Sequence, residues 1–177
     1  MRLRHTWIIG ALILAGCGDS IHDLVNRDDL GQIEALLAKD PSQVNARTPL
    51  GKTPLHYAVT YGKPKLIEFL IGKGADVNAA DDTGLTPLHA AAMLGRVKEA
   101  DLLLKHGANI EARDEFGDTP LHTAALFGQS TTLKLLAGAG ANLHTTNNDN
   151  VTPMEAALKS RREEAVATLE RIEKQDH

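Results

Sequence analysis

The first candidates in this chain for holding a metal or attacking a substrate are its eight histidines and its one cysteine. Three of the histidines, His56, His89 and His122, recur at a constant spacing, and imidazole nitrogens are common zinc ligands. Equivalent residues of neighbouring stacked units lie a helix-packing distance of roughly 8–10 Å apart, whereas the ligands of one zinc ion each lie about 2 Å from it. Distance therefore argues against a shared metal site, and we expect no metal and no cofactor.

The other candidate residues form no catalytic group. The sequence contains no nucleophile elbow, phosphate-binding loop or metalloprotease helix. Acidic residues are frequent between the expected helices, but the repetition described below accounts for most of them. We therefore expect no catalytic residue and no enzymatic activity. The histidines that are scattered without partners at a usable spacing are His5, His22, His106, His144 and His177.

The three regularly spaced histidines belong to a longer motif with the same period. Thr-Pro-Leu-His occupies residues 53–56, 86–89 and 119–122, and Thr-Pro-Met-Glu at residues 152–155 continues the series with two substitutions. A fixed period near this length signals a unit that cannot bury its own apolar face and must stack on copies of itself. The sequence therefore predicts a stacked repeat array.

Each copy carries the signals for two short helices. The threonine of the motif can cap the first helix, and the proline can occupy its first position, where a missing N–H costs nothing. A column of glycines, meaning glycines at the same position of successive copies, follows each helix, and glycine readily adopts the left-handed conformation that ends one. Apolar residues at helical spacing define the second helix. The glycine columns are Gly62, Gly95, Gly128 and Gly74, Gly107, Gly140, and the apolar columns begin with Ile67, Phe69 and Leu70.

In these motifs and columns the chain resembles the ankyrin-repeat proteins. The resemblance implies an all-α repeat solenoid in which paired antiparallel helices are joined by projecting β-turn loops. It also implies that the motif histidines make structural hydrogen bonds near the helix start, and that other proteins bind at the turn tips and the exposed face of the first helices. We expect an ankyrin-repeat domain over residues 20–177, with a front cap at 20–50, repeats at 51–83, 84–116 and 117–149, and a back cap at 150–177.

Two helices depart from the pattern of the middle copies. In the fourth unit the second helix, over residues 130–139, begins with threonines and carries Gly138, and a helical glycine costs about 1 kcal/mol relative to alanine. We therefore expect this unit to be the least stable. The back cap is expected to end in a charged helix over residues 161–175, with one apolar stripe made of Ala165, Val166, Leu169 and Ile172.

The start of the chain, residues 1–16, has the features of a secretory signal. Arg2 and Arg4 precede an apolar run that begins at Trp7 and is too short to cross a bilayer, which takes about 20 residues. Leu14-Ala15-Gly16-Cys17 resembles the lipobox of bacterial lipoproteins, whose cysteine is lipidated after cleavage. We therefore expect a signal peptide at 1–16 and lipidation of Cys17; the alternative is a plain secretory signal with an incidental cysteine.

Lipidation would attach the domain to a membrane without a spanning helix. Several acyl chains, at about 0.8 kcal/mol per buried methylene, anchor a protein firmly. Residues 17–19 would form a short tether, so the front cap would lie close to the lipid surface. In the enterobacterial sorting rule an aspartate directly after the cysteine retains a lipoprotein in the inner membrane, and Gly18 holds that position here. We expect a periplasm-facing protein, with the outer membrane favoured.

The charge of the chain disfavours nucleic acid as a partner. Loss of the segment 1–16 removes two of the 19 basic residues, which leaves 17 against 23 acidic residues and a formal net charge of −6. A phosphate-binding surface needs a basic patch, and no local run supplies one. We expect a monomer that binds another protein.

The binding surface can be located from the period. The columns before the first-helix glycines and before the turn glycines are unusually apolar, and an exposed contiguous apolar surface usually marks an interaction site. The alternative is that these side chains pack between units. The residues of this predicted strip are Leu50, Tyr61, Met93, Leu94, Phe116, Leu126 and Phe127.

Two classes of function fit these features. The first is a lipid-anchored envelope module that binds another protein as a scaffold, a protective partner or an immunity-type inhibitor. The second is a structural envelope lipoprotein without a defined protein partner. The apolar strip favours the first class. An enzyme would need catalytic residues beyond those whose presence the repeat pattern already explains.

Overall fold

The computed structural model of the chain describes residues 19–175, so the expected signal segment, Cys17 and Gly18 lie outside the described residues. The described part contains ten α-helices and one short 3₁₀ helix, and no strand. In chain order they are α1 (Ile21–Arg27), α2 (Leu30–Lys39), η1 (Pro41–Asn45), α3 (Pro54–Thr60), α4 (Pro64–Gly72), α5 (Pro87–Leu94), α6 (Val97–Lys105), α7 (Pro120–Phe127), α8 (Ser130–Gly138), α9 (Pro153–Lys159) and α10 (Glu163–Glu173).

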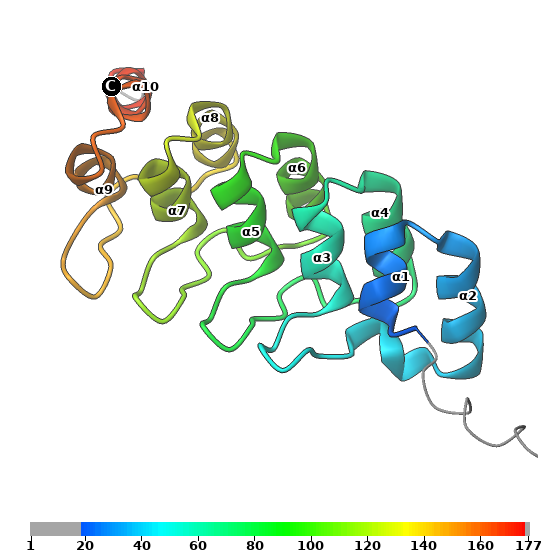
Figure 1. The fold of residues 1–177 in the computed structure, drawn as a ribbon. Helices are drawn as coiled ribbons and strands as arrows, with labels where there is room; N and C mark the ends of the chain where they lie inside the picture. Colours follow the sequence, from blue (N-terminus) through cyan, green and yellow to red (C-terminus); the bar gives the residue numbers. More distant parts are fainter. Residues whose placement is uncertain (1–18, 176–177) are drawn as a thin grey trace, which may run out of the picture.

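The helices form two layers. The first helices of the units, α1, α3, α5, α7 and α9, pack on one another in chain order, and α4, α6, α8 and α10 pack in the same order in the second layer. The loops before α3, α5, α7 and α9 project from one edge of the stack (Figure 1). The arrangement confirms the all-α repeat solenoid with projecting turns that the sequence predicts.

Helices α5 and α7 begin and end as their residue types predict. The side-chain oxygen of Thr86 accepts a hydrogen bond from the backbone N–H of His89, and proline fills the first helical position. The helix ends at Gly95, whose φ of 64° is easily adopted by glycine, and Gly128 ends α7 with φ 74°. The sequence signals therefore act as predicted in the middle of the array.

The predicted bounds of the last helix are wrong. The sequence predicts a helix over residues 161–175, but α10 begins at Glu163 and ends at Glu173. Arg161 occupies the glycine column with a left-handed φ of 56°, which interrupts the helix, and Arg162 is the residue before its start. The sequence gives no sign of this break between α9 and α10, because arginine stands where the other repeats have glycine. Within the predicted stripe, Ala165 and Leu169 are buried and Val166 and Ile172 are half-buried.

The motif histidines connect each unit to the next. The backbone N–H of Thr53 donates to Nδ1 of His56 at 3.1 Å, so this nitrogen carries no proton and Nε2 does. The Nε2–H group then donates to the carbonyl of Leu85, in the next unit, at 3.0 Å. His89 and His122 make the same pair of bonds, to the carbonyls of Asp118 and Val151 at 3.1 and 2.9 Å. The structural role implied by the resemblance is thus visible in the geometry.

Acid should weaken these connections. Burial holds the pKa of His56 and of His89 below the ordinary value of 6.5, although their bonds to carbonyl groups act in the opposite direction. As the pH falls below about 6.5, the unfolded chain binds protons that the folded chain excludes, so the free energy of unfolding decreases from there down to the lowered pKa values. We expect the urea midpoint of unfolding to be lower at about pH 5.5 than at about pH 7.5.

A control variant separates this effect from general acid sensitivity. His89→Asn should lower the midpoint at neutral pH but make it change less between the two pH values. Equal midpoints for the wild-type protein at both pH values would contradict a role for the neutral imidazoles.

Helix α8 contains two buried hydroxyl groups that lack partners. Among the described residues, the side-chain oxygens of Ser130 and Thr132 are the buried polar atoms with no hydrogen bond. A buried, unpaired polar group costs about 1–3 kcal/mol. These groups add to the weak helix propensity that Gly138 brings to the end of α8.

Helix α8 should therefore open more readily than its neighbour α6. We expect amide hydrogen exchange to be faster over residues 130–139 than over residues 97–106, because repeat arrays open locally. Thr132→Val, which replaces the hydroxyl by a methyl group, should slow exchange in α8 about fivefold, the equivalent of about 1 kcal/mol.

The matched control is Thr123→Val in α7. The hydroxyl of Thr123 is also buried, but it donates to the carbonyl of Thr119 at 3.3 Å, so its removal should bring no such gain. Equal exchange in the two helices, or no effect of Thr132→Val, would refute the expectation.

Candidate protein-binding surface

The residues of the predicted strip lie at the surface. Leu50 and Phe116, at turn tips, are 67% and 64% exposed, and Met93 is half-buried. Buried packing between units therefore does not describe Leu50 and Phe116, whereas the other members are partly covered by the array, and the role of the strip in binding remains a prediction. The other exposed members are Tyr61, Leu94, Leu126 and Phe127.

Only part of the strip is brought together in one hollow. A cavity of about 310 Å³ joins Phe116 on the loop before α7 to Met93 of α5 and to Leu126 and Phe127 of α7. Leu50, Tyr61 and Leu94 do not line it. Tyr61 instead lies beside Tyr57, with 6.2 Å between the ring centroids. The rest of the lining is formed by Thr83, Leu85, Asp114, Glu115, Asp118 and Thr123.

The loop that presents Phe116 is held by hydrogen bonds on both sides. Within the loop, Oδ1 of Asp114 accepts from the backbone N–H groups of Phe116 and Asp118, each at 2.9 Å. Towards the preceding loop, the N–H of Glu115 donates to the carbonyl of Thr83 at 2.9 Å, and towards the following loop the carbonyl of Phe116 accepts from the N–H of Asn148 at 3.0 Å. The aromatic side chain is therefore displayed from a fixed backbone.

Gly117 allows the neighbouring loops to approach this closely. Its φ is 75°, and a Cβ at this position would lie 2.8 Å from the backbone nitrogen of Asn148. Any larger residue would both strain the backbone and push the next loop away. The glycine predicted as part of the turn is thus required by the contact between turns.

Three acidic residues of the lining were missed by the sequence analysis. Asp114, Glu115 and Asp118 surround the same hollow as Phe116. The signal that could have found them is the recurrence of acidic residues in the turn columns, because Asp81 and Asp82 hold the positions of Asp114 and Glu115 one repeat earlier. Asp114 is present because its carboxylate accepts backbone hydrogen bonds that stabilise the turn. The exposed carboxylate of Glu115 has no such role in the turn.

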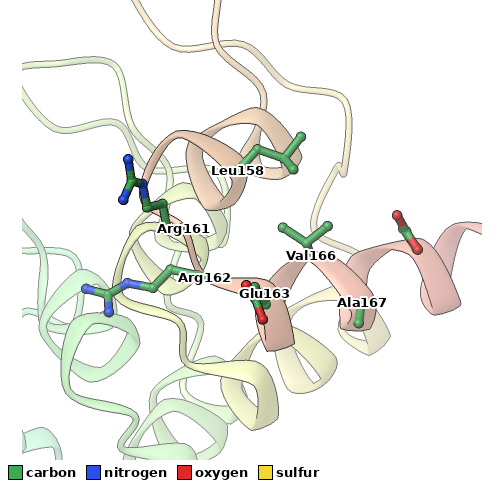
Figure 2. Close-up of a pocket in the computed structure, with 7 residues that line it drawn as sticks. Leu158, Arg161, Arg162, Glu163, Val166 and Ala167 are labelled. Atoms are coloured by element: carbon green, nitrogen blue, oxygen red, sulfur yellow. The ribbon is translucent and has the colours of Figure 1, made fainter.

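A second hollow lies at the end of the stack. Its volume is about 440 Å³, and Leu158 of α9 and Val166 of α10 form its apolar part, beside Arg161, Arg162 and Glu163 (Figure 2). Leu158 is 56% exposed, whereas Val59, Ala92 and Ala125 in the same column are fully buried. The difference arises because no further unit of the described chain covers α9. This hollow is therefore the open end of the array, and its apolar character follows from its place in the repeat.

The described residues show neither a metal site nor a membrane span. Between residues 19 and 175, no group of three His, Cys, Asp or Glu side chains is placed to hold a metal ion. Within the same range, no helix has the length and apolar character needed to cross a bilayer. In each motif histidine, one ring nitrogen makes a hydrogen bond within its own unit and the other makes a hydrogen bond to the next unit.

Comparison with models of known protein families identifies the repeat. The family described as ankyrin repeats, in three copies, matches residues 21–114 and, in a second match, residues 110–176. Together the two matches cover every helix of the described residues and every copy of the motif named above.

Proposed function

The chain belongs to the ankyrin-repeat family, and on this basis we propose that it binds another protein at the hollow around Phe116. Ankyrin repeats are a protein–protein interaction module, and the observation that carries the assignment to this surface is the gathering of Phe116, Met93, Leu126 and Phe127 in one exposed cavity. We call this cavity the Phe116 hollow.

The hollow has the physical properties of an interaction site. Exposed apolar side chains that lie together usually mark a binding surface, and aromatic residues in pockets supply much of the binding energy in known interfaces. The loop is fixed by backbone hydrogen bonds between units, and the ends of the two helices accept bonds from Gln129 and Arg162 of the following units, so little conformational entropy is lost when a partner binds. These properties favour a binding module over a purely structural lipoprotein.

The proposal extends to the place where the protein acts. We infer that Cys17 is lipidated and that the domain faces the periplasm from a membrane, with the outer membrane favoured. The support is the sequence of residues 1–17, with Arg2 and Arg4, the short apolar run and Leu14-Ala15-Gly16 before Cys17. In this setting the module would act as a scaffold, a protective partner or an inhibitor of another envelope protein.

The binding proposal is tested by removing the aromatic groups of the hollow. Phe116→Ser with Phe127→Ser should weaken binding of the purified native partner at least about thirtyfold, because loss of an anchor commonly costs about 2 kcal/mol or more. The melting temperature should stay close to that of the wild-type protein, since both side chains are exposed. The dissociation constant is measured by calorimetry after the partner has been isolated from native membranes and identified.

Two further variants make this result specific. Leu158→Ser removes a leucine at the end of the stack whose exposed fraction, 56%, lies between those of Phe127 and Phe116, and it should leave binding unchanged. Leu94→Ser reports whether the contact extends along the strip beyond the hollow. Wild-type affinity of the folded Phe116→Ser, Phe127→Ser variant would place the binding site elsewhere and defeat the proposal.

Lipidation is tested at Cys17. Cys17→Ser should abolish incorporation of labelled fatty acid and leave the precursor uncleaved before residue 17, because the cysteine is the acceptor of the lipid. Mass spectrometry of the wild-type protein should show an acylated cysteine as its first residue. An unmodified Cys17, or a mature chain that starts elsewhere, would mean that the protein carries a plain secretory signal.

A further inference from the structure

We propose that the Phe116 hollow selects a partner segment in which a bulky apolar side chain lies directly beside a lysine or arginine. This inference rests on the proposed function and adds the chemistry of the partner. It follows from the composition of the lining, which combines apolar side chains of two helices and Phe116 with three acidic residues of the Phe116 loop.

The apolar side is formed by the two helices. Met93, Leu126 and Phe127 come from the ends of α5 and α7, and none of these side chains carries a charge. Phe116 closes this side from the loop, and it is 64% exposed without a partner. A bulky apolar side chain placed here would cover all four groups and remove their surface from water.

The acidic side is formed by the loop. Asp114, Glu115 and Asp118 are among the residues that line the hollow, and no lysine or arginine is, although most of the surface inside the hollow is apolar. Within residues 19–175, none of the three takes part in an ion pair. Asp114 is held by backbone N–H groups and Asp118 accepts from Nδ2 of Asn147 at 2.7 Å, so hydrogen bonds fix these two carboxylates without neutralising them.

The arginines of the turns bind backbone carbonyl groups. The guanidinium group of Arg113 donates to the carbonyls of Gly117 and Thr146, at 3.2 and 2.9 Å, and lies outside the lining. At the first turn Arg47 donates to the carbonyl of Ala80. Arg113 stays charged beside the loop, but among the described residues it forms no ion pair with the three acidic residues, so a partner cation could still pair with them.

The acidic lining is confined to the middle of the array. The first turn carries Arg47 and Lys52, and the fourth turn has asparagine at positions 147, 148 and 150, with Asp149 as its one acidic residue. A partner that placed only apolar groups in the hollow would desolvate carboxylates without compensation, which is unfavourable. A partner cation would avoid this cost and gain Coulomb energy beside apolar walls that strengthen the local field.

Short probes test the preference directly. N-acetyl-Phe-Arg-amide, N-acetyl-Phe-Gln-amide and N-acetyl-Phe-Glu-amide share the aromatic group and differ in charge. In nuclear magnetic resonance titrations of the ¹⁵N-labelled protein, we expect all shifted amides to cluster at the hollow. The arginine probe should bind about fivefold tighter than the glutamine probe, a modest factor because the carboxylates are partly exposed, and the preference should shrink as salt is added.

A charge reversal in the protein provides a second test of the preference. Glu115→Lys should abolish the preference for the arginine probe, because Glu115 is exposed and its backbone N–H keeps its bond to Thr83. The matched control is Glu68→Lys, which makes the same charge change on the exposed face of α4 and should leave the preference intact.

The outcomes separate this inference from the proposed function. Equal affinities of the three probes at the hollow, or an unchanged preference in Glu115→Lys, would overturn the charge selection. The proposed function would then stand or fall on the Phe116→Ser, Phe127→Ser variant alone. Probe-induced shifts away from the hollow, or no binding of any probe, would overturn the inference as well, because the hollow would then fail to recognise even the apolar group.

Discussion

The buried hydrogen bond from a motif histidine to the next unit is the contact on which the regular stack depends. In each case one ring nitrogen completes the cap of its own helix, and the other reaches a carbonyl of the following unit. Such a bond is satisfied only when the next unit is in place, and a buried polar ring without it would be costly. The front cap lacks the histidine in this column, but His22, one position earlier in register, contacts the carbonyl of Lys52 at 3.2 Å.

Further bonds at both edges of the stack fix the surfaces that a partner would meet. At the end of the first helices, Arg96, Gln129 and Arg162 each donate to a carbonyl of the preceding unit, at 3.0–3.1 Å. At the other edge, the second, third and fourth turns each donate a backbone N–H to the turn before. The Phe116 hollow lies between these two sets of bonds, so its shape depends on how the units that line it stack.

The period of the sequence was sufficient to predict the fold because the residues that start, end and stack the helices recur with it. It was less informative where a residue departs from its column. Arg161 takes the conformation of the glycines in its column, and this shifts the start of α10 to Glu163. The membership of the hollow could not be read from columns either, because Phe116, on the loop before α7, lines it together with Met93 of α5 and Leu126 of α7, whereas Leu94 does not line it. Such contacts depend on how far each loop leans over the helices, which a linear pattern does not contain.

The central claim is that the partner occupies the Phe116 hollow, and site-specific photocrosslinking in living cells tests it most directly. A photoreactive phenylalanine analogue is placed at residue 116 or, as a control at the open end of the stack, at residue 158. The account predicts one dominant crosslinked protein from position 116 and none from position 158, with the attached peptide carrying a bulky apolar residue next to lysine or arginine. Crosslinking of the partner from position 158 but not from position 116 would contradict it.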